Sequence, residues 1–370
     1  VINQLTVTAP EINAVAATIA DEKKVVVSTE GCPRYLGRVI KNVNTKAATP
    51  EWMERALVRS GIRQHSILVD ITNYVLMELG QPLHAFDAAK IQGSVQVRQA
   101  NTAEKLVLLN EQEVELNEKV MVIADDEKAL AIAGIMGGLS SSVTDETQDI
   151  FLESAFFAPL AIAGRARSFG LHTDASQRYE RGVDFELPML AMHRASQLIA
   201  ELAGGEFGPV TTAEQAAVLP KREAIELEQA QVDQLLGYRL DAAFIADALT
   251  RLGCAVTVKA EGQWSVVPPS HRYDMAIYQD LIEEVARIHG YDNIQISLPK
   301  IEAKLAQYQD QFEMTQLRQT LVTLGYQEAI SFSFADLKLE KQLNAAVNPL
   351  ALANPISSDL AVMRSTLLSS

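Results

Sequence analysis

The segment from Arg165 to Asp184 constrains this chain most, because it is strongly polar and lies between two apolar segments, 150–162 and 187–202. It contains four arginines, one histidine, three acidic residues and two serines. Unpaired charge is costly to bury, so such a segment is either a solvated loop held by salt bridges or the wall of a binding site. Small residues near its centre favour a wall, because they leave room for a ligand: Thr173, Ala175 and Ser176.

The length and composition are those of a globular protein with more than one domain. A chain of 370 residues with 48% hydrophobic and 6% aromatic residues predicts two or three domains. No apolar run approaches the roughly 20 residues of a membrane span, so no membrane partner is expected. The net charge of −15 argues against general nucleic-acid binding but leaves room for a local basic patch.

The two cysteines, Cys32 and Cys254, are far apart and have no His or Cys neighbours at metal-binding spacing. A disulfide framework and a structural zinc site are therefore not expected, which suits a reducing compartment and predicts a cytoplasmic protein. The chain begins at Val1 without Met and ends inside a helix-like pattern over 363–370. We therefore expect it to be a piece of a longer protein.

Local patterns predict a mixed α and β organisation for the first two hundred residues. Thr49 and Pro50 are typical of a helix start, with Thr49 as N-cap, and this helix should end near Gly61. The other expected elements are an extended lead-in over 1–30, a strand over 35–43, a helix from Asp70 to Leu79, a turn over 81–87 that carries His84, antiparallel strands between 94 and 122, a strand over 150–154 and a helix over 185–202.

The remainder predicts a linker and two further units. After a linker over 209–220, residues 221–297 should hold helices and a two-stranded wing, a winged-helix-like arrangement whose acidic third helix speaks against insertion into a DNA groove. Its expected elements are helices over 231–236, 241–252 and 275–289, with Asp241 capping the second, and strands over 255–259 and 263–267. A charged helix over 303–324 and a strand over 329–334 begin a third unit.

The motifs argue against two kinds of site and leave two candidate functional residues. The glycines of 129–138 do not form a dinucleotide or phosphate-binding loop, because neither G-x-G-x-x-G nor Gly-Lys-Ser/Thr is present. Ser154 and Ser176 lack the G-x-S-x-G setting of an activated serine. His84 is a functional candidate, although a lone histidine is more often structural. Glu153 ends an apolar strand and needs a partner, which is either a ligand or a salt bridge to a nearby arginine, Arg165 or Arg167.

With these residues in view, the sequence resembles the β subunit family of bacterial phenylalanyl-tRNA synthetases. The resemblance rests on motifs in the family's order along nearly the whole chain: Gly31-Cys-Pro-Arg-Tyr-Leu-Gly-Arg38, Asp70-Ile-Thr-Asn through Gln81-Pro-Leu-His-Ala-Phe-Asp87, Ala133-Gly-Ile-Met-Gly-Gly138, Gly170-Leu-His-Thr through Gly182-Val-Asp184, Pro269-Ser-His-Arg-Tyr-Asp274 and Glu284 to Asn293.

The resemblance implies an α+β, multidomain fold. It places a lead-in at 1–29, a mixed α/β editing domain at 30–215, a winged-helix-like small domain at 219–297 and the start of a class-II synthetase-like antiparallel module at 303–370. Partners implied by the family are the synthetase α subunit, in an α2β2 enzyme, and tRNA(Phe). The full enzyme uses ATP and Mg²⁺, but this stretch implies no cofactor and no metal site of its own.

The implied activity is hydrolysis of tyrosine wrongly attached to tRNA(Phe). By similarity, the catalytic positions are His84 and Thr173, and the substrate-binding positions are Glu153, Gly137, Ala175 and Arg63. A carboxylate that binds the tyrosine hydroxyl would reject phenylalanine by a factor of ~10⁴, because phenylalanine leaves it unpaired. His84 and Thr173 would orient water or ribose, and Arg63 would hold the phosphate or ribose end.

Two other interpretations of the chain are open, and the first of them uses the same residues. One is a metal-free hydrolase of another ester or peptide. The other is a scaffold that docks the α subunit and tRNA without hydrolytic activity.

Overall fold

The structure, a computed structural model, describes residues 9–298 and 313–369. The described residues form two units, and the boundary between them lies between Ile296 and Ser297. The first unit is a mixed α/β assembly with several sheets, which agrees with the expected mixture of helices and strands.

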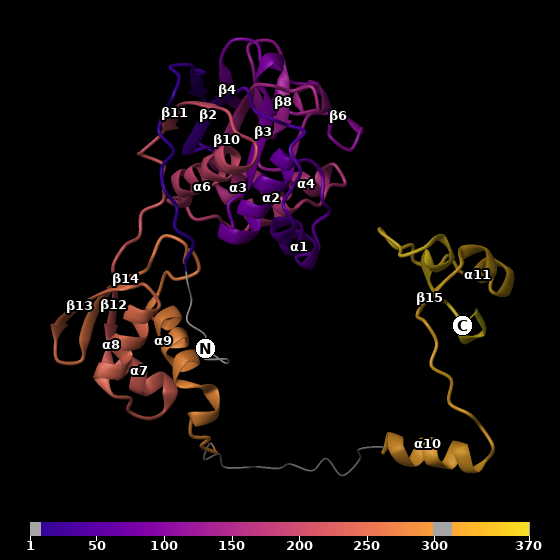
Figure 1. Cartoon of the computed structure of the whole chain (residues 1–370). Coiled ribbons are helices and arrows are strands. Elements are labelled where there is room, and N and C mark those ends of the chain that lie inside the picture. Colours follow the sequence, from indigo (N-terminus) through magenta and orange to yellow (C-terminus); the bar gives the residue numbers. More distant parts are fainter. Residues whose placement is uncertain (1–8, 299–312, 370) are drawn as a thin grey trace. The chain divides into compact units, whose positions relative to one another are not determined.

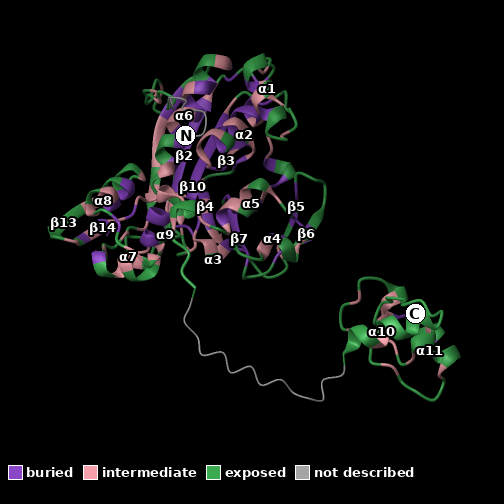
Figure 2. Ribbon diagram, turned by 90° about the horizontal axis from the view of Figure 1, so that it is seen from below, coloured by how far each residue is buried: buried purple, intermediate pink, exposed green. Residues whose placement is uncertain are grey.

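A four-stranded antiparallel sheet is the central layer of the first unit (Figure 1). Its order is β11 (Glu206–Glu214), β2 (Arg34–Lys41), β10 (Ile150–Phe156) and β3 (Leu83–Asp87). Every residue of β10 is buried, and buried residues run along β2 and β10 in Figure 2. Since both faces of these strands are covered, side chains that alternate along them enter two different cores.

Helices cover one face of the central sheet. Leu36, Ile40 and Leu152 pack there in one hydrophobic core with side chains of the helices. The helices on this face are α1 (Glu51–Arg59), α2 (Ile67–Leu79) and α6 (Leu187–Leu202). Helix α2 ends at Gly80, whose φ of +83° suits glycine, and the chain then enters β3.

A second sheet covers the opposite face, where Tyr35, Phe86 and Phe151 share a core with its strands. Its order is β1 (Val25–Val27), β4 (Val95–Gln99), β7 (Met121–Ala124), β8 (Ala129–Ile132) and β9 (Met136–Gly137). A hairpin of β5 (Lys105–Val107) and β6 (Glu113–Glu115) and two 3₁₀ helices, η1 (Ala88–Lys90) and η2 (Leu139–Ser141), complete this side.

Half of the polar segment 165–184 is helical, and the rest consists of turns and irregular chain. It is preceded by α3 (Pro159–Ile162) and contains α4 (Arg165–Ser168) and α5 (Asp174–Tyr179). Thr173 caps α5, because its side chain accepts a hydrogen bond from the Ser176 amide at 3.0 Å. Ala166, Leu171 and Tyr179 anchor the segment in the core between the two sheets.

Several expected elements of this unit were wrong in detail. His84 lies on a strand, not in a turn, because residues 83–87 pair with β10. Residues 206–214 form the edge strand β11 where a linker was expected over 209–220, and Pro209 is accommodated at a break in register between Phe207 and Val210.

The helix boundaries also shifted. Pro50, not Thr49, is the N-cap of α1. The Thr49 hydroxyl instead donates to the Asp70 carboxylate at 2.6 Å, and Asp70 also accepts from the His65 amide at 2.8 Å. Helix α2 begins at Ile67, three residues before the expected start, so that Asp70 lies in its first turn.

Residues 225–293 build a small domain of helices and a three-stranded sheet with its own core. It contains β12 (Ile225–Glu228), α7 (Gln229–Leu236), α8 (Ala242–Arg251), β13 (Ala255–Ala260), β14 (Gln263–Val267), α9 (Tyr278–His289) and the 3₁₀ helix η3 (Tyr291–Asn293). The wing was expected to have two strands, but it has three, because β12 also pairs with β14. The Asp241 cap is confirmed, whereas α9 starts at Tyr278 rather than Met275.

The second unit contains α10 (Met314–Thr323), β15 (Phe334–Ala335), α11 (Leu337–Leu343), β16 (Val362–Met363) and the 3₁₀ helices η4 (Ser358–Leu360) and η5 (Leu367–Ser369). The strand expected over 329–334 was wrong, because the two-residue strand β15 begins only at Phe334. The helix expected over 303–324 is matched by α10 only over 314–323, and the portion of that expectation before residue 313 lies outside the described residues.

Candidate active site

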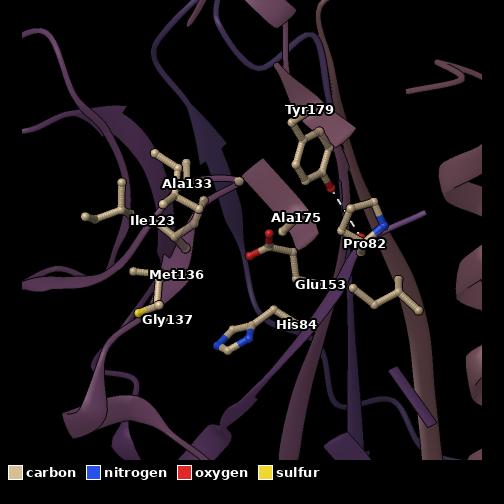
Figure 3. A pocket seen from close by; sticks show the side chains of 14 residues that line it. Pro82, His84, Ile123, Ala133, Met136, Gly137, Glu153, Ala175 and Tyr179 are labelled. Carbon is tan, nitrogen blue, oxygen red and sulfur yellow. Dashed lines mark hydrogen bonds between the residues drawn. The ribbon is translucent and has the colours of Figure 1, made fainter. Parts of the chain in front are cut away.

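A cavity of about 410 Å³, counting its open mouth, lies between the central sheet and the turn that joins β8 to β9. Glu153 of β10 and His84 of β3 form one wall, and Gly137 and Met136 form the opposite wall. Ala175 and Tyr179 of α5 complete it. Figure 3 shows the Glu153 carboxylate and the His84 ring directed toward the space between these elements.

The register of the central sheet brings the acid and the histidine together. Glu153 lies directly opposite His84 on β3 and opposite Gly37 on β2. Residues directly opposite in an antiparallel pair project from the same face, so both side chains point toward the second sheet. Gly37 is required here for space, since a Cβ would lie 2.1 Å from the Phe151 ring.

Glu153 is a buried carboxyl group with one hydrogen-bond donor among the described residues. The Tyr35 hydroxyl donates to its Oε2 at 2.8 Å. Burial raises the pKa of Glu153 to about 7, and the Tyr35 hydrogen bond offsets part of that rise. The salt bridge to Arg165 or Arg167 that the sequence left open is absent among the described ion pairs, so Glu153 is held by a tyrosine instead.

His84 is kept neutral by its surroundings. Burial lowers its pKa to about 4. Its ring packs edge-on against Phe86 with 4.4 Å between the ring centroids. Its Nε2 is buried without a hydrogen-bond partner among the described residues, and it faces Gly137, where a Cβ would come within 2.7 Å of it. A buried imidazole nitrogen without a partner can accept a hydrogen bond from, or donate one to, a ligand or water atom that reaches it.

The six residues expected at a site do not all meet. His84, Gly137, Glu153 and Ala175 line the cavity together. Thr173 lies just beside it, where its hydroxyl donates to the Ile135 carbonyl at 2.9 Å and so ties α5 to the β8–β9 turn. Arg63 is exposed in the loop between α1 and α2 and is not among the lining residues.

Sequence reasoning missed two tyrosines of the site. Tyr35 is fully buried and bonds Glu153, and Tyr179 lines the cavity while its hydroxyl accepts from Gln81 at 3.1 Å. Both lie in quoted motifs but received no role. Alternation along residues 34–41, which puts Tyr35 on the same face as Gly37, was the signal that could have found the first.

The alternative of an activated serine finds no support in the geometry. The Ser154 hydroxyl donates to the Pro188 carbonyl at 2.8 Å, on the helix side of the sheet. Ser176 is engaged with Thr173 in the cap of α5. In the described part of the chain, no three or more His, Cys, Asp or Glu side chains are grouped so as to hold a metal ion. No described helix is both long and apolar enough to cross a membrane.

Family models match most of the chain in three consecutive segments. A model described as B3/4 domain matches residues 31–204, one described as tRNA synthetase B5 domain matches 225–291, and one described as phenylalanyl tRNA synthetase beta chain CLM domain matches 294–370. The cavity lies entirely within the first of these segments. The matches place the chain among aminoacyl-tRNA synthetase subunits.

Curated relatives narrow this class to one subunit. The phenylalanine--tRNA ligase beta subunit of Acinetobacter baylyi is 77% identical over 370 residues, which is 100% of this chain and 47% of that protein. The subunit of the same name from Aliivibrio fischeri is 51% identical over 99% of this chain and 46% of its own length. The chain therefore belongs to the phenylalanine--tRNA ligase beta subunit family, and it spans about half the length of these relatives.

The chain is also similar to solved structures. An N-terminal fragment of the phenylalanyl-tRNA synthetase beta-subunit from Pyrococcus horikoshii aligns over 76% of this chain and 78% of that chain, with 16% identity and a TM-score of 0.36.

Proposed function

We propose that this chain carries the proofreading site of a phenylalanine--tRNA ligase, where tyrosine wrongly attached to tRNA(Phe) is hydrolysed. The whole enzyme, with its α subunit in an α2β2 assembly, would attach phenylalanine to tRNA(Phe) using ATP and Mg²⁺ in the cytoplasm. The observation that carries the proposal is the buried carboxyl group of Glu153, which faces a cavity walled by Gly137 and Ala175.

The carboxyl group supplies the selectivity. Tyrosine differs from phenylalanine by one hydroxyl, and a phenol in the cavity satisfies a buried acid that phenylalanine leaves unpaired. A site built to bond a substrate hydroxyl rejects the analogue without it by about 10⁴-fold or more. The absence of a side chain at Gly137 and the single methyl of Ala175 leave room for the ring.

Hydrolysis itself requires a positioned water molecule. The water oxygen adds to the acyl carbon, the bond to the ribose oxygen breaks, and the water proton ends on that ribose oxygen. His84 is neutral over the physiological pH range, because burial holds its pKa at about 4, so it can accept a hydrogen bond from the water. The Thr173 hydroxyl holds the opposite wall of the cavity through its hydrogen bond to the Ile135 carbonyl. Arg63, which lies outside the cavity, would contact the tRNA.

The test is deacylation of Tyr-tRNA(Phe) by the ligase assembled from α and β subunits. Glu153→Gln should lower the deacylation rate at least about tenfold, since a hydrogen bond to a charged group contributes about 1.5–3 kcal/mol. His84→Ala should lower it as well. Glu226→Gln, which alters an exposed carboxylate paired with Lys259 in the small domain, is the matched control.

Full deacylation by both Glu153→Gln and His84→Ala would refute the proposal. Activity on other esters without competition by tyrosine would favour a general hydrolase. Binding of the α subunit and tRNA without any deacylation would leave the chain a scaffold.

A further inference from the structure

The two oxygens of the Glu153 carboxyl group have different surroundings. Oε2 accepts a hydrogen bond from the Tyr35 hydroxyl at 2.8 Å. Among the described residues, Oε1 has no hydrogen-bond donor, yet it is not one of the fully buried unsatisfied atoms. One oxygen is therefore held by the protein while the other remains free to meet a ligand in the cavity.

The pairing of β2 with β10 brings the Tyr35 hydroxyl to this position. Tyr35 pairs with Ala155 on β10, two residues from Glu153, so its side chain projects from the same face of the sheet. The position directly opposite Glu153 is Gly37, over which the Phe151 ring lies. Tyr35 is fully buried, and a buried tyrosine hydroxyl requires a partner, which Glu153 provides.

We propose that Tyr35 is the positioning residue that sets the selectivity of this cavity, because it holds Oε2 of Glu153 and leaves Oε1 alone to recognise the phenolic hydroxyl of the substrate. This inference rests on the proposed function. A carboxyl group free to rotate would offer either oxygen, and the bound phenol would lose the fixed geometry that excludes phenylalanine.

The charged and titratable groups around Glu153 define how the effect can be measured. Tyr35 and Cys32 face it from β2 and the residues just before that strand, His84 from β3 and Tyr179 from α5. Of these groups, Tyr35 is the one that hydrogen-bonds the carboxyl group, and its bond lowers the Glu153 pKa. Removing the hydroxyl should therefore raise that pKa further above about 7.

The experiment compares tyrosine and phenylalanine binding by calorimetry between pH 5.5 and 8.5 in the whole chain. Tyr35→Phe keeps the ring and removes only the hydroxyl. It should reduce the preference for tyrosine about tenfold, the value of one hydrogen bond to a charged group, and move the pH midpoint of tyrosine binding upward. Tyr74→Phe is the control, because it removes a tyrosine–carboxylate bond of 3.1 Å to Glu78, away from the cavity.

A double-mutant cycle separates positioning from a merely structural role. With Glu153→Ala already present, Tyr35→Phe should have no further effect on the preference, since Tyr35 acts only through that carboxyl group. Additive effects of the two changes would overturn the inference. So would an unchanged preference and pH midpoint in Tyr35→Phe. If the unaltered chain binds both amino acids equally, the proposed function itself fails.

Discussion

Glu153 and His84 lie side by side on neighbouring strands, but burial moves their pKa values in opposite directions. The pKa of Glu153 rises from an ordinary 4.5 to about 7, and that of His84 falls from 6.5 to about 4. Both shifts favour the neutral form of the side chain. At mildly acidic pH both side chains are therefore neutral, and Glu153 gains its charge as the pH rises through about 7.

This pair predicts opposite pH dependences of stability in two variants. The raised pKa of Glu153 gives stability that is complete below pH 4.5 and lost as the pH rises through about 7. The lowered pKa of His84 gives stability that is complete above pH 6.5 and lost as the pH falls toward 4.

The free energy of unfolding of Glu153→Gln should therefore increase relative to that of the unaltered chain as the pH rises from 5 to 8, by roughly 3 kcal/mol. The free energy of unfolding of His84→Asn should increase relative to that of the unaltered chain as the pH falls. Urea unfolding at a series of pH values measures both, and parallel curves for all three proteins would contradict the assigned pKa shifts.

At the scale of elements, the β8–β9 turn closes directly over β3, and glycine makes that closure possible. A Cβ at Gly137 would lie 2.6 Å from Cε1 of His84. Gly137→Ala should therefore force the turn and the His84 ring apart, with a cost of about 1–3 kcal/mol for overpacking, and should weaken tyrosine binding about tenfold or more. Calorimetry and urea unfolding measure the two effects.

The control is Gly204→Ala, where φ is +68° and nothing lies within 4 Å of the added Cβ. That variant should lose stability through backbone strain while tyrosine affinity stays unchanged. Equal losses of affinity in both variants would show that the contact between Gly137 and His84 is unimportant.

Elements with strong local signals were predictable from the sequence, whereas those set by distant partners were not. Gly80 marks the end of α2, and Asp241 marks the start of α8, because caps are local chemistry. The strands β3 and β11 were missed, since their existence depends on pairing with β10 and β2. Thr49 has the residue type of an N-cap, but its hydroxyl is used by Asp70, 21 residues away.

At the scale of the whole molecule, the assembly of the cavity could not be predicted from the local residue patterns alone. Motif resemblance brought His84, Gly137, Glu153 and Ala175 together before any geometry was known, and the structure places these four around one space. Tyr35 could not be found in this way, since its role depends on the register between β2 and β10. Arg63 is exposed outside the cavity, so a role for it depends on a tRNA that reaches beyond the site.

The location of the cavity predicts that the second unit is not needed for recognition of the amino acid. Every lining residue falls between Pro82 and Tyr179, and the partner of Glu153 is Tyr35. The first unit also has its own hydrophobic cores, on both faces of the central sheet and in the small domain. A chain ending at Ile296 should therefore bind tyrosine within about twofold of the affinity of the whole chain, because parts of a protein that share no partners contribute additively. Its preference for tyrosine over phenylalanine should also persist, as measured by calorimetry on both proteins at the same pH.

The contradicting outcome is a loss of tyrosine binding in a shortened chain that still unfolds cooperatively. Residues 297–370 would then complete the site, and the cavity of the first unit alone would be insufficient for selection of the hydroxyl.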